Sequence, residues 1–597
     1  MLHIPRSKID LPPGLNPINL EIIRHGLQAI PDEIETDITR TAYSPLIYEY
    51  KDYAVGLVDV EGQLIAHSRG GIPIFMANVL GLAVLDGLEC YDRDEIRPGD
   101  VFMSNWSGTF GQHLNNVTMY TPVFADRDGK NLVAFMAVLT HWMDVGGRYV
   151  GSSASNDTTD IWQEGIQFRS VKIRSQGKPV PEIYRIVEVN TRFPEMVLGD
   201  LAAQLAACIK GKALYEELLV RHGLDLVTKA THTIWKQSAE AARAAVQSIP
   251  DGRYSATSFL DDDGVDKKPV HFDISVEIQG ERFIVDYTEI NDQVRGPFNS
   301  GRFGGGISAA RLAFKYLTTP NEMTNQGSFE PLEVILPDGK ILSARPGAPL
   351  ARYSSPMPTV IDTIIKALAP AVPARVAAAH HGQAGSHRFH GFIENGRRFS
   401  NLDTAHGGWG ASHDMDGPGP FKTLAHGDTH DVPVEMQEAL YPIRIDHVGF
   451  ITDSGGAGQY RGGPGVEKRY TILHPCWLTV TFVRHDCPAW GLLGGKNGAP
   501  ASVELDRDGK LSGRLLKVNE VSLAAGDLVT LYTGGGGGYG SPLERDPEAV
   551  AADIKAGLVS VKAAASIYGV ILDEEKRINE NKTLKTRRAL TEGGSAA

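Results

Sequence analysis

Apolar side chains recur along this chain with two different periods, which predicts a mixture of helices and strands. Residues 16–43 carry apolar positions at helical spacing, with Asn16 placed as an N-cap and Pro17 at the first helical position. Pro31 is expected to break or kink this helix. A second apolar stripe, in residues 194–222, predicts a long helix with one face in the core.

Alternation of apolar and polar positions predicts several strands in the first half of the chain. Residues 53–66 are typical of a hairpin, and further strands are expected at residues 101–104, 117–124 and 132–139. A polar turn at residues 126–130 separates the last two of these strands. We therefore expect them to pair as a hairpin.

In the second half, residues 270–278 and 282–288 alternate and predict another sheet, which a glycine-rich loop at residues 301–306 follows. Helices are predicted within residues 310–317 and 359–369. The remaining chain up to the last glycine run consists of short apolar segments bounded by turns. That pattern favours a β sandwich or a barrel-like domain.

The order of these segments predicts a multi-lobed α+β protein with mixed sheets, packed helices and a C-terminal β-rich domain. Short helices are expected at residues 547–556 and 560–568, followed by a frayed end. The expected regions are an N-terminal α+β region at 1–250, a middle α+β region with glycine-rich and histidine-rich loops at 251–431, a β-rich domain at 432–545 and a helical C-terminal tail at 546–597.

Length and charge narrow the classes of partner. The 597 residues exceed what a single hydrophobic core usually organises, which agrees with several lobes. There are 59 Lys and Arg against 72 Asp and Glu, a formal net charge of -13, and the only basic run is a short one at residues 582–588. Nucleic acid is therefore not expected as a partner.

The cysteines and the N-terminus indicate a cytoplasmic protein. Residues 1–13 lack the apolar core of a signal peptide, and no run of about 20 uninterrupted apolar residues predicts a membrane span. No CxxC spacing occurs, so neither a zinc knuckle nor a disulfide framework is expected. The four cysteines are widely separated: Cys90, Cys208, Cys476 and Cys487.

Two histidines at the ends of the predicted hairpin are the strongest candidates for chemistry. His113 precedes its first strand and His141 follows its second, so the hairpin would bring the two imidazoles close together. Neutral imidazoles bind zinc, manganese or iron, and Asp144 would add a carboxylate oxygen and negative charge. The alternative is that all three residues only form hydrogen bonds at the ends of buried strands. No HExxH-type spacing distinguishes the two interpretations.

Other motifs are less specific. There is no GxxxxGK[ST] and no strand followed by a GxGxxG helix start, and the glycine run at residues 534–538 lacks a following lysine, so it is interpreted as a structural turn. Ser44 has no nucleophile elbow around it. His381, within a dense group of histidines, is a candidate acid, base or phosphate contact, with ordinary hydrogen bonding as the alternative.

Taken in order along the chain, a set of short segments resembles the B-type chains of the hydantoinase/5-oxoprolinase family. Related members are the second subunit of caprolactamase and the metal-binding subunits of acetone and acetophenone carboxylases. The segments are RTAYSP at 40–45, RPGDVF at 97–102, His113 with Val117 and Thr118, HWMDVGG at 141–147, GDL at 199–201, PLEV at 331–334, GGWG at 407–410, DSGGAG at 453–458, YRGG at 460–463, GGGGGYG at 534–540 and PLERDP at 542–547.

This resemblance implies a division of labour between two subunits. An A-type partner subunit would bind ATP with Mg²⁺ and phosphorylate the oxygen of an amide or ketone carbonyl. The B-type chain (the hydantoinase B type) would hold a divalent metal (Zn, Mn or Fe) and complete the reaction on a small-molecule substrate. A hetero-oligomer with two copies of each main subunit is expected, because an activated phosphate ester must be kept from bulk water.

The resemblance also implies ligands. His113 matches the first histidine of the family's usual Thr-His-Leu-Pro-Asp segment and His141 the histidine one hairpin later, so both are implied as metal ligands. The family's aspartate three residues after the first histidine is Asn116 here, and a carboxamide is a poorer ligand for a divalent cation. Asp144 would restore the charge, and Asp52 lies where the family often has an acidic residue near the ion.

Three functions remain open from the sequence. With water as nucleophile the expected reaction is ATP-dependent hydrolysis of a cyclic amide, a hydantoin or lactam, with His141, Asp144 and His381 as catalytic candidates. Residues 353–359 depart from the family's Glu-Thr-Ser-Gln-Arg segment, which keeps ATP-dependent carboxylation of a ketone as an alternative. The third possibility, motivated by Asn116, is a structural subunit whose metal site has decayed.

Overall fold

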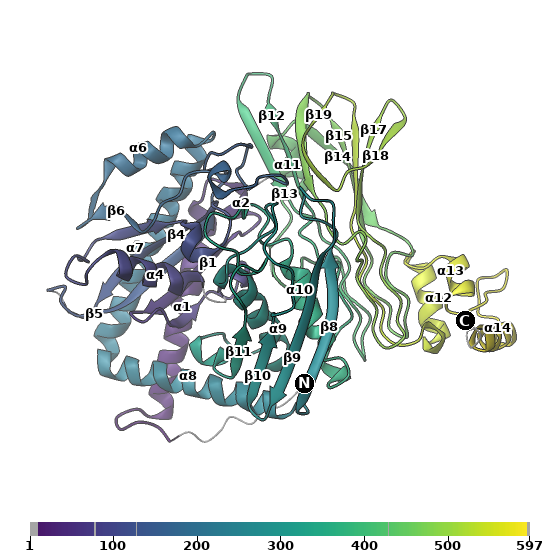
Figure 1. The fold of residues 1–597 in the computed structure, drawn as a ribbon, viewed down its shortest axis with the longest axis horizontal. Coiled ribbons are helices and arrows are strands. Elements are labelled where there is room, and N and C mark those ends of the chain that lie inside the picture. Colours follow the sequence, from purple (N-terminus) through teal and green to yellow (C-terminus); the bar gives the residue numbers. More distant parts are fainter. Residues whose placement is uncertain (1–9, 77–78, 127, 154, 428, 594–597) are drawn as a thin grey trace.

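The computed structural model describes the whole chain except residues 1–9, 77–78, 127, 154, 428 and 594–597. Figure 1 shows a broad body of helices and sheets, a β-rich lobe beside it and a small helical part that projects at the C-terminal end. This confirms the predicted α+β class. Residues 1–9, which belong to the segment interpreted as lacking a signal peptide, lie outside the described residues.

A seven-stranded antiparallel sheet organises the N-terminal region. In spatial order its strands are β2 (Leu64–His67), β1 (Tyr53–Asp59), β5 (Leu132–His141), β4 (Asn116–Phe124), β3 (Val101–Ser104), β6 (Val171–Ser175) and β7 (Lys178–Pro179). The predicted hairpin at residues 117–139 is therefore confirmed as β4 and β5.

Helices cover both faces of this sheet. The helical elements of the region are α1 (Pro17–Thr41), α2 (Pro45–Tyr48), α3 (Pro73–Met76), α4 (Val79–Cys90), α5 (Ser107–Phe110), η1 (Ile161–Glu164), α6 (Pro181–Asn190), α7 (Pro194–His222) and α8 (Leu224–Gln247). On one face Tyr120 packs against Gly87 of α4, and on the other Met136 packs against Gly211 of α7. Strand β4 is buried along its whole length as a result.

Helix α1 is not broken at Pro31, which corrects one of the two alternatives predicted there. Helix α1 begins after Asn16, whose side chain accepts a hydrogen bond from Asn19 N at 2.8 Å, and it continues through Pro31 to Thr41. Proline removes one backbone donor, but the apolar stripe continues beyond it with Ile34 fully buried. Burial of that stripe offsets the lost hydrogen bond.

A second sheet of four strands follows, with β10 and β11 parallel and the other pairs antiparallel. Its strands are β11 (Leu332–Ile335), β10 (Arg282–Asp286), β9 (Val270–Gln279) and β8 (Gly252–Leu260). Its helical elements are η2 (Phe303–Ile307), α9 (Ser308–Thr318), η3 (Gln326–Phe329), α10 (Met357–Ala367) and η4 (Pro373–Arg375). The glycine segment predicted as a loop instead forms η2, a π-helical turn that runs directly into α9.

Two further sheets enclose one apolar core and form the predicted β-rich lobe. One contains β13 (Arg398–Asp403), β12 (Ser386–Phe392), β16 (Cys476–Thr481) and β19 (Lys517–Leu523), and the other β14 (Ile443–Phe450), β15 (Val466–Ile472), β20 (Leu528–Tyr532), β17 (Ser502–Arg507) and β18 (Lys510–Arg514). Helix α11 (Val434–Leu440) packs beside β14. Strands β12 and β13 belong to this lobe, because β12 pairs with β16. The lobe therefore includes residues on both sides of the boundary expected at residue 431.

Glycine-rich segments form a layer of closely packed backbone next to this lobe. Each amide from Gly535 to Gly538 donates to a carbonyl of another segment, at 2.8 to 3.2 Å. A Cβ on Gly536 would lie 1.9 Å from Trp409 O, so only glycine allows this approach. The interpretation of residues 534–538 as structural is confirmed, because their N–H groups are already bonded to protein.

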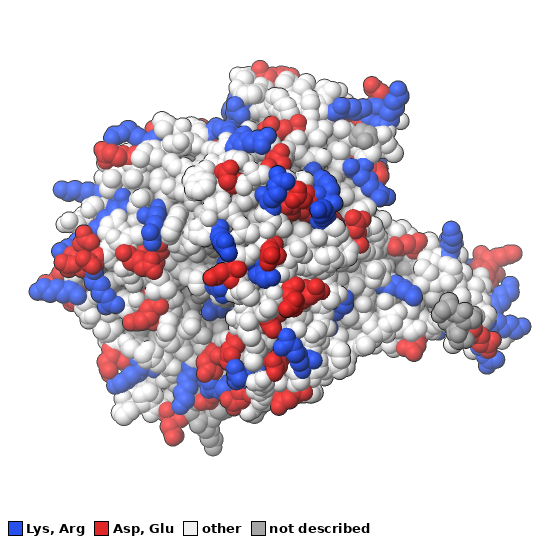
Figure 2. All heavy atoms as spheres, in the orientation of Figure 1, with Lys and Arg blue, Asp and Glu red and all other residues white. Residues whose placement is uncertain are grey.

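Three helices and a short 3₁₀ turn complete the chain: η5 (Pro542–Glu544), α12 (Pro547–Lys555), α13 (Val561–Ser566) and α14 (Glu580–Gly593). The first two helices were predicted, whereas α14 replaces the frayed end expected there up to Gly593. This part has its own small apolar core around Val550 and Tyr568, and it projects from the body in Figures 1 and 2.

Two further features of the described residues are the distribution of charge on the surface and one long apolar stretch. On the face shown in Figure 2, acidic and basic side chains are interspersed over the body. One stretch, Pro73–Cys90, is long and apolar enough to span a membrane, but 67% of it is buried inside the protein. That degree of burial is typical of a core helix.

Candidate functional site

The hairpin β4–β5 brings His113 and His141 together, as predicted. Asn116 lies directly opposite His141 in the strand register, and Asn116 N donates to His113 O at 3.3 Å. The two imidazole centroids are 4.8 Å apart. Residues on three positions of one hairpin end therefore converge on a single point.

Helix α7 fixes this end of the hairpin through Gln204. Its side-chain amide donates to Val117 O at 2.8 Å and to Val138 O at 2.7 Å, one carbonyl from each strand. Its Oε1 accepts from Thr140 Oγ1 at 2.9 Å and from Trp142 Nε1 at 3.2 Å. The residues on both sides of His141 are thus held by one buried amide.

The site contains buried polar atoms that have no hydrogen-bond partner. They are Nδ1 of His113, Nδ1 of His141, Oδ1 of Asn116 and Oδ1 of Asp52. Unsatisfied buried acceptors cost free energy unless a ligand uses them. Within the described residues, no group of three or more His, Cys, Asp and Glu side chains is close enough to hold a metal ion.

Both histidines are neutral near pH 7. Burial, with the nearby Arg388 guanidinium, lowers the pKa of His141 to about 3. Burial also lowers the pKa of His113 well below its usual value, and the charges of His141, Arg352 and Arg388 add to this effect. Neutral imidazoles keep a lone pair for a ligand.

Asp52 lies beside the pair, in the turn between α2 and β1. Its carbonyl accepts a hydrogen bond from His141 N at 3.1 Å. Burial raises the pKa of its carboxyl group to about 8, so it is protonated at neutral pH unless a cation binds. Burial raises the pKa of Tyr353, and the charge of Asp52 adds to this effect.

Tyr353, in the segment just before α10, borders the histidine pair. Its ring centroid is 5.0 Å from that of His113, and its hydroxyl accepts a hydrogen bond from Asn116 Nδ2 at 3.1 Å. Burial raises the pKa of Tyr353 well above its usual value, so the hydroxyl keeps its proton. The loop that departs from the family pattern thus contacts the histidine pair.

The carboxylate of Asp144 is hydrogen-bonded to its own loop and to Arg192. Its carboxylate accepts from Gly146 N at 3.1 Å and Gly151 N at 2.8 Å. Arg192 donates to the same carboxylate through its backbone N at 3.0 Å and through Nη1 at 2.8 Å. Four donors therefore hold the carboxylate of Asp144 and fix the loop after His141, while its expected role as a metal ligand stays a prediction.

His381 is placed with the glycine-rich segments. Its Nε2 lies 3.1 Å from Phe421 O, and its ring packs against Gly407 and Gly534. Burial lowers its pKa well below the usual value. The neighbouring His380 bonds Asp362 at 2.6 Å. Nδ1 of His381 is buried without a hydrogen-bond partner, so its role as acid, base or phosphate contact stays a prediction.

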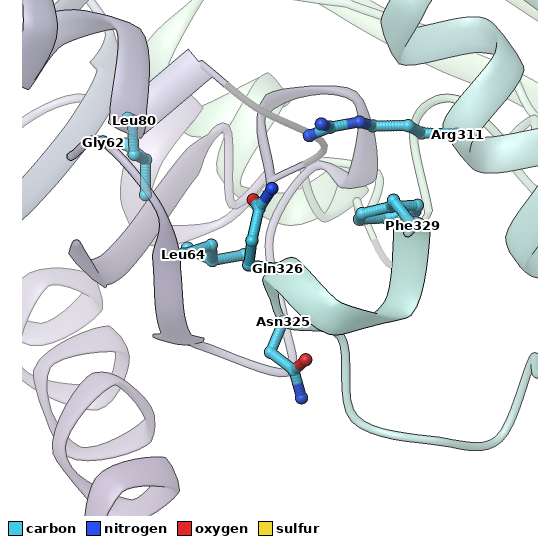
Figure 3. A pocket seen from close by; sticks show the side chains of 8 residues that line it. Gly62, Leu64, Leu80, Arg311, Asn325, Gln326 and Phe329 are labelled. Carbon is cyan, nitrogen blue, oxygen red and sulfur yellow. The ribbon is translucent and has the colours of Figure 1, made fainter. Parts of the chain in front are cut away.

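Two pockets lie elsewhere in the described structure, and neither is lined by the histidine pair or by Tyr353. One of about 430 Å³ lies between residues 107–111, 301–303 and 343–350. Figure 3 shows another pocket, lined by Gly62, Leu64, Leu80, Gly81, Arg311, Asn325, Gln326 and Phe329. Its space of about 10 Å³ admits one water at most, so it is too small for a substrate.

Sequence reasoning missed the two buried arginines of this site, Arg352 and Arg388. Arg352 precedes Tyr353, and Arg388 lies in the middle of β12. The available signal was an arginine between apolar and histidine residues in the segment Ser386–Phe392, where a charge requires a partner.

Comparisons with known proteins show the family of the chain. The model of the family described as hydantoinase B/oxoprolinase matches residues 16–542. The chain belongs to the hydantoinase B/oxoprolinase family. It is therefore an enzyme subunit of that type, which confirms both the resemblance and the prediction of an enzyme.

Two relatives match over almost their entire length. A protein of Pseudomonas sp. (strain NS671), described as the B-type chain of a D-/L-hydantoinase, is 29% identical over 98% of this chain and 99% of its own. The beta chain of the caprolactamase of Pseudomonas jessenii is 30% identical over 96% of this chain and 99% of its own.

Solved structures show the same fold. The crystal structure of the ATP-dependent caprolactamase of Pseudomonas jessenii superposes with a TM-score of 0.89 at 29% identity, over 96% of this chain and 100% of that chain. A nucleotide-free acetone carboxylase structure superposes with a TM-score of 0.87 over 97% of this chain and 84% of that chain. At 19% identity this second match establishes the fold alone.

Proposed function

We propose that this chain is the B-type subunit of an ATP-dependent cyclic amidohydrolase that opens a hydantoin or lactam ring. The observation that carries the proposal is the His113–His141 pair, with its two buried and unpartnered Nδ1 atoms, in a chain that aligns end to end with a caprolactamase subunit. An A-type partner subunit phosphorylates the carbonyl oxygen, and this chain completes the hydrolysis.

The residues at the histidine pair fit a divalent ion. Nδ1 of both histidines and Oδ1 of Asn116 are buried acceptors without a hydrogen bond, and they converge at one end of the hairpin. These residues would hold the ion, and Asp52 is joined to the pair by the hydrogen bond that its backbone carbonyl accepts from His141 N at 3.1 Å. When bound, zinc, manganese or iron at this position supplies Lewis acidity to a carbonyl oxygen.

The remaining site residues handle protons and exclude water. Tyr353 keeps its hydroxyl proton and donates it in a hydrogen bond to a substrate oxygen, while it accepts from Asn116 Nδ2. Asp52 holds a proton on its carboxyl group at neutral pH and releases it when positive charge enters the site. Because all three side chains are buried, their interactions with the substrate are stronger than in bulk water.

The partner is part of the proposal. The sequence contains no phosphate-binding motif, and the amides of Gly535 to Gly538 are bonded to protein, which supports an ATP site on another subunit. An activated phosphate ester must pass between the two sites without meeting bulk water, so a stable hetero-oligomer is required, with two copies of each main subunit. A cytoplasmic location belongs to the same proposal.

The decisive experiment purifies the chain together with its A-type partner and screens hydantoins, lactams and aryl ketones for ATP consumption. The expected result is ring opening of a cyclic amide without any requirement for bicarbonate. His113→Ala should abolish ring opening, with the complex still assembled in size-exclusion chromatography. Turnover by the single chain at the rate of the complex would refute the division of labour.

Carboxylation of a ketone is the second candidate, favoured by the Tyr353 loop that contacts His113 in place of the family's usual segment. Strict dependence of ATP consumption on bicarbonate, with a ketone as substrate, would establish it instead. The third candidate, a structural subunit, predicts a complex in which His113→Ala changes neither bound metal nor turnover.

A further inference from the structure

Buried arginines in this protein divide into two groups. Of the five that are buried among the described residues, three form ion pairs with aspartates: Arg461 with Asp553, Arg484 with Asp362, and Arg545 with Asp416 and Asp553. The other two are Arg352 and Arg388. Within the described chain neither has a carboxylate oxygen within 4.0 Å, although buried charges are normally paired.

Arg388 lies 1% exposed on β12 and reaches across to the loop after His141. Its Nη1 donates to Val150 O at 3.2 Å, and the guanidinium occupies the place where a side chain on Gly151 would be, with Nη1 only 1.0 Å from that Cβ position. Nε and Nη2 are buried and have no hydrogen-bond partner. Two charged donors thus point into the interior without an acceptor.

Arg352 approaches the same place from the Tyr353 loop. Its Nε donates to Ser155 O at 3.1 Å and its Nη1 to Ser386 Oγ at 3.3 Å. Ser386 is the first residue of β12, the strand that carries Arg388. Tyr353, the next residue in the chain, packs against His113. Both guanidinium groups are therefore tied to elements that border the histidine pair.

The acids that face these arginines do not neutralise them. Burial lowers the pKa of Arg388, and the charge of Asp144 opposes this effect. Four donors already use the carboxylate of Asp144, however, and two of them belong to Arg192. A charge on Glu164 would raise the pKa of Arg352. Burial raises the pKa of Glu164 itself to about 8, and its carboxyl group accepts hydrogen bonds from Thr158 Oγ1 and Leu350 N. Burial and mutual repulsion lower the pKa of Arg352 to about 9, which leaves it charged at neutral pH.

We propose that Arg352 and Arg388 form an oxyanion-binding subsite beside His113 and His141, which takes the phosphate or carboxylate group of the molecule on which this subunit acts. The planar guanidinium fork matches the oxygen spacing of both groups and binds them with charge-assisted hydrogen bonds. An oxyanion would pair the two donors of Arg388 that the protein leaves unused. It would also relieve the repulsion between the two arginines.

This inference rests on the proposed function and narrows it. The molecule that reaches the histidine pair carries an oxyanion, either as a phosphorylated carbonyl made by the partner or as a carboxylate of the substrate itself. A neutral lactam that has not been phosphorylated does not satisfy the subsite. Selection for the activated intermediate would follow, because an unoccupied pair of buried charges is costly.

The test uses the full chain, stripped of metal with a chelator, in buffer with about 0.15 M chloride to suppress weak surface binding. Inorganic phosphate and acetate are titrated separately by calorimetry. We expect saturable binding of one anion per chain, with Arg388→Gln and Arg352→Gln each weakening it at least tenfold. Arg295→Gln, which removes the same charge from an exposed arginine, should change it less than twofold.

Arg388→Lys is the control for a folding defect in Arg388→Gln, because it keeps the positive charge and removes only the planar guanidinium group. It should fold like the parent and weaken binding at least threefold. Preference for phosphate identifies the activated intermediate as the ligand, and preference for acetate identifies a substrate carboxylate. No binding of either anion, or equal binding by all variants, would overturn the subsite. Because neither metal, partner nor ATP is present, this result is independent of whether the complex hydrolyses amides.

Discussion

Asn116 donates a hydrogen bond from Nδ2 to the hydroxyl of Tyr353 at 3.1 Å, which joins two positions 237 residues apart in the chain. The sequence resemblance implied a departure from the family pattern at Asn116 and in the segment that begins at Tyr353. The same Nδ2 donates to Gln112 Oε1 at 3.0 Å, so the amide orientation is fixed and Oδ1 is left as the free acceptor. A carboxylate at residue 116 has no donor for either partner.

Replacing Asn116 with aspartate should therefore remove the two hydrogen bonds that Nδ2 donates and add one negative charge. Asn116→Asp is expected to tighten binding of Mn²⁺ or Zn²⁺ by about tenfold or more, because a carboxylate adds a negative ligand. Competition with a chelating dye measures the change. Asn131→Asp, on the exposed turn at the far end of the same hairpin, should leave the affinity as it is. Equal affinities in all three proteins would argue against an ion at this position.

The histidine pair should account for bound metal in the purified chain. His113→Ala and His141→Ala are each expected to reduce metal affinity by about 100-fold or more, because each removes one of two imidazole ligands. Elemental analysis after dialysis against a defined free metal concentration reports the loss. His25→Ala, whose side chain is 70% exposed on α1, is the matched control. Full metal retention in both site variants would contradict the assignment.

Metal binding should release a proton from the carboxyl group of Asp52. With its carboxyl pKa near 8, about 0.9 of the chains carry a proton there at pH 7, and a cation beside it would expel that proton. The histidines release almost none, since they are already neutral. Calorimetry in two buffers of different ionisation enthalpy counts the protons.

The sign of the pH dependence follows from this raised pKa. Proton release should be close to one at pH 6 to 7 and should fall toward zero above about pH 9, where Asp52 is ionised before the metal arrives. Asp52→Asn should abolish release at every pH. Release that is unchanged in Asp52→Asn would show that another group titrates.

The glycine layer should tolerate no side chain at its closest approach. Gly536→Ala places a Cβ 1.9 Å from the backbone oxygen of Trp409, so the segments must move apart, at a cost of about 3 kcal/mol or more. Gly534→Ala meets its nearest atom at 3.2 Å and should cost much less. Thermal melting of both full-length variants measures the difference. Equal melting temperatures would show that the layer is not close-packed.

The isolated chain should not bind ATP. The glycine amides from Gly535 to Gly538 donate to protein carbonyls, so they do not form a phosphate-binding loop. Calorimetric titration with ATP and Mg²⁺ should give no saturable heat with the single chain. The complex with its A-type partner should give one. Saturable binding to the single chain would move the nucleotide site onto this subunit.

Local sequence patterns were sufficient for much of the scaffold. The N-cap Asn16, the strands on either side of the turn at residues 126–130 and the long helix α7 all rest on short-range periodicity, and each was predicted. One alternative at Pro31, a break in the helix, and the loop expected before α9 were wrong, because packing outweighs the local preference of these residues.

The sequence by itself determined the hairpin that joins His113 to His141, since two adjacent strands and a polar turn allow few other pairings. Only the tertiary structure decided what surrounds that pair. Tyr353 and Arg388 come from segments more than 200 residues away, and nothing local to them specifies which face of the sheet they meet. The carboxylate of Asp144 likewise accepts hydrogen bonds from Arg192 and two glycine amides, contacts that exist only in the folded chain.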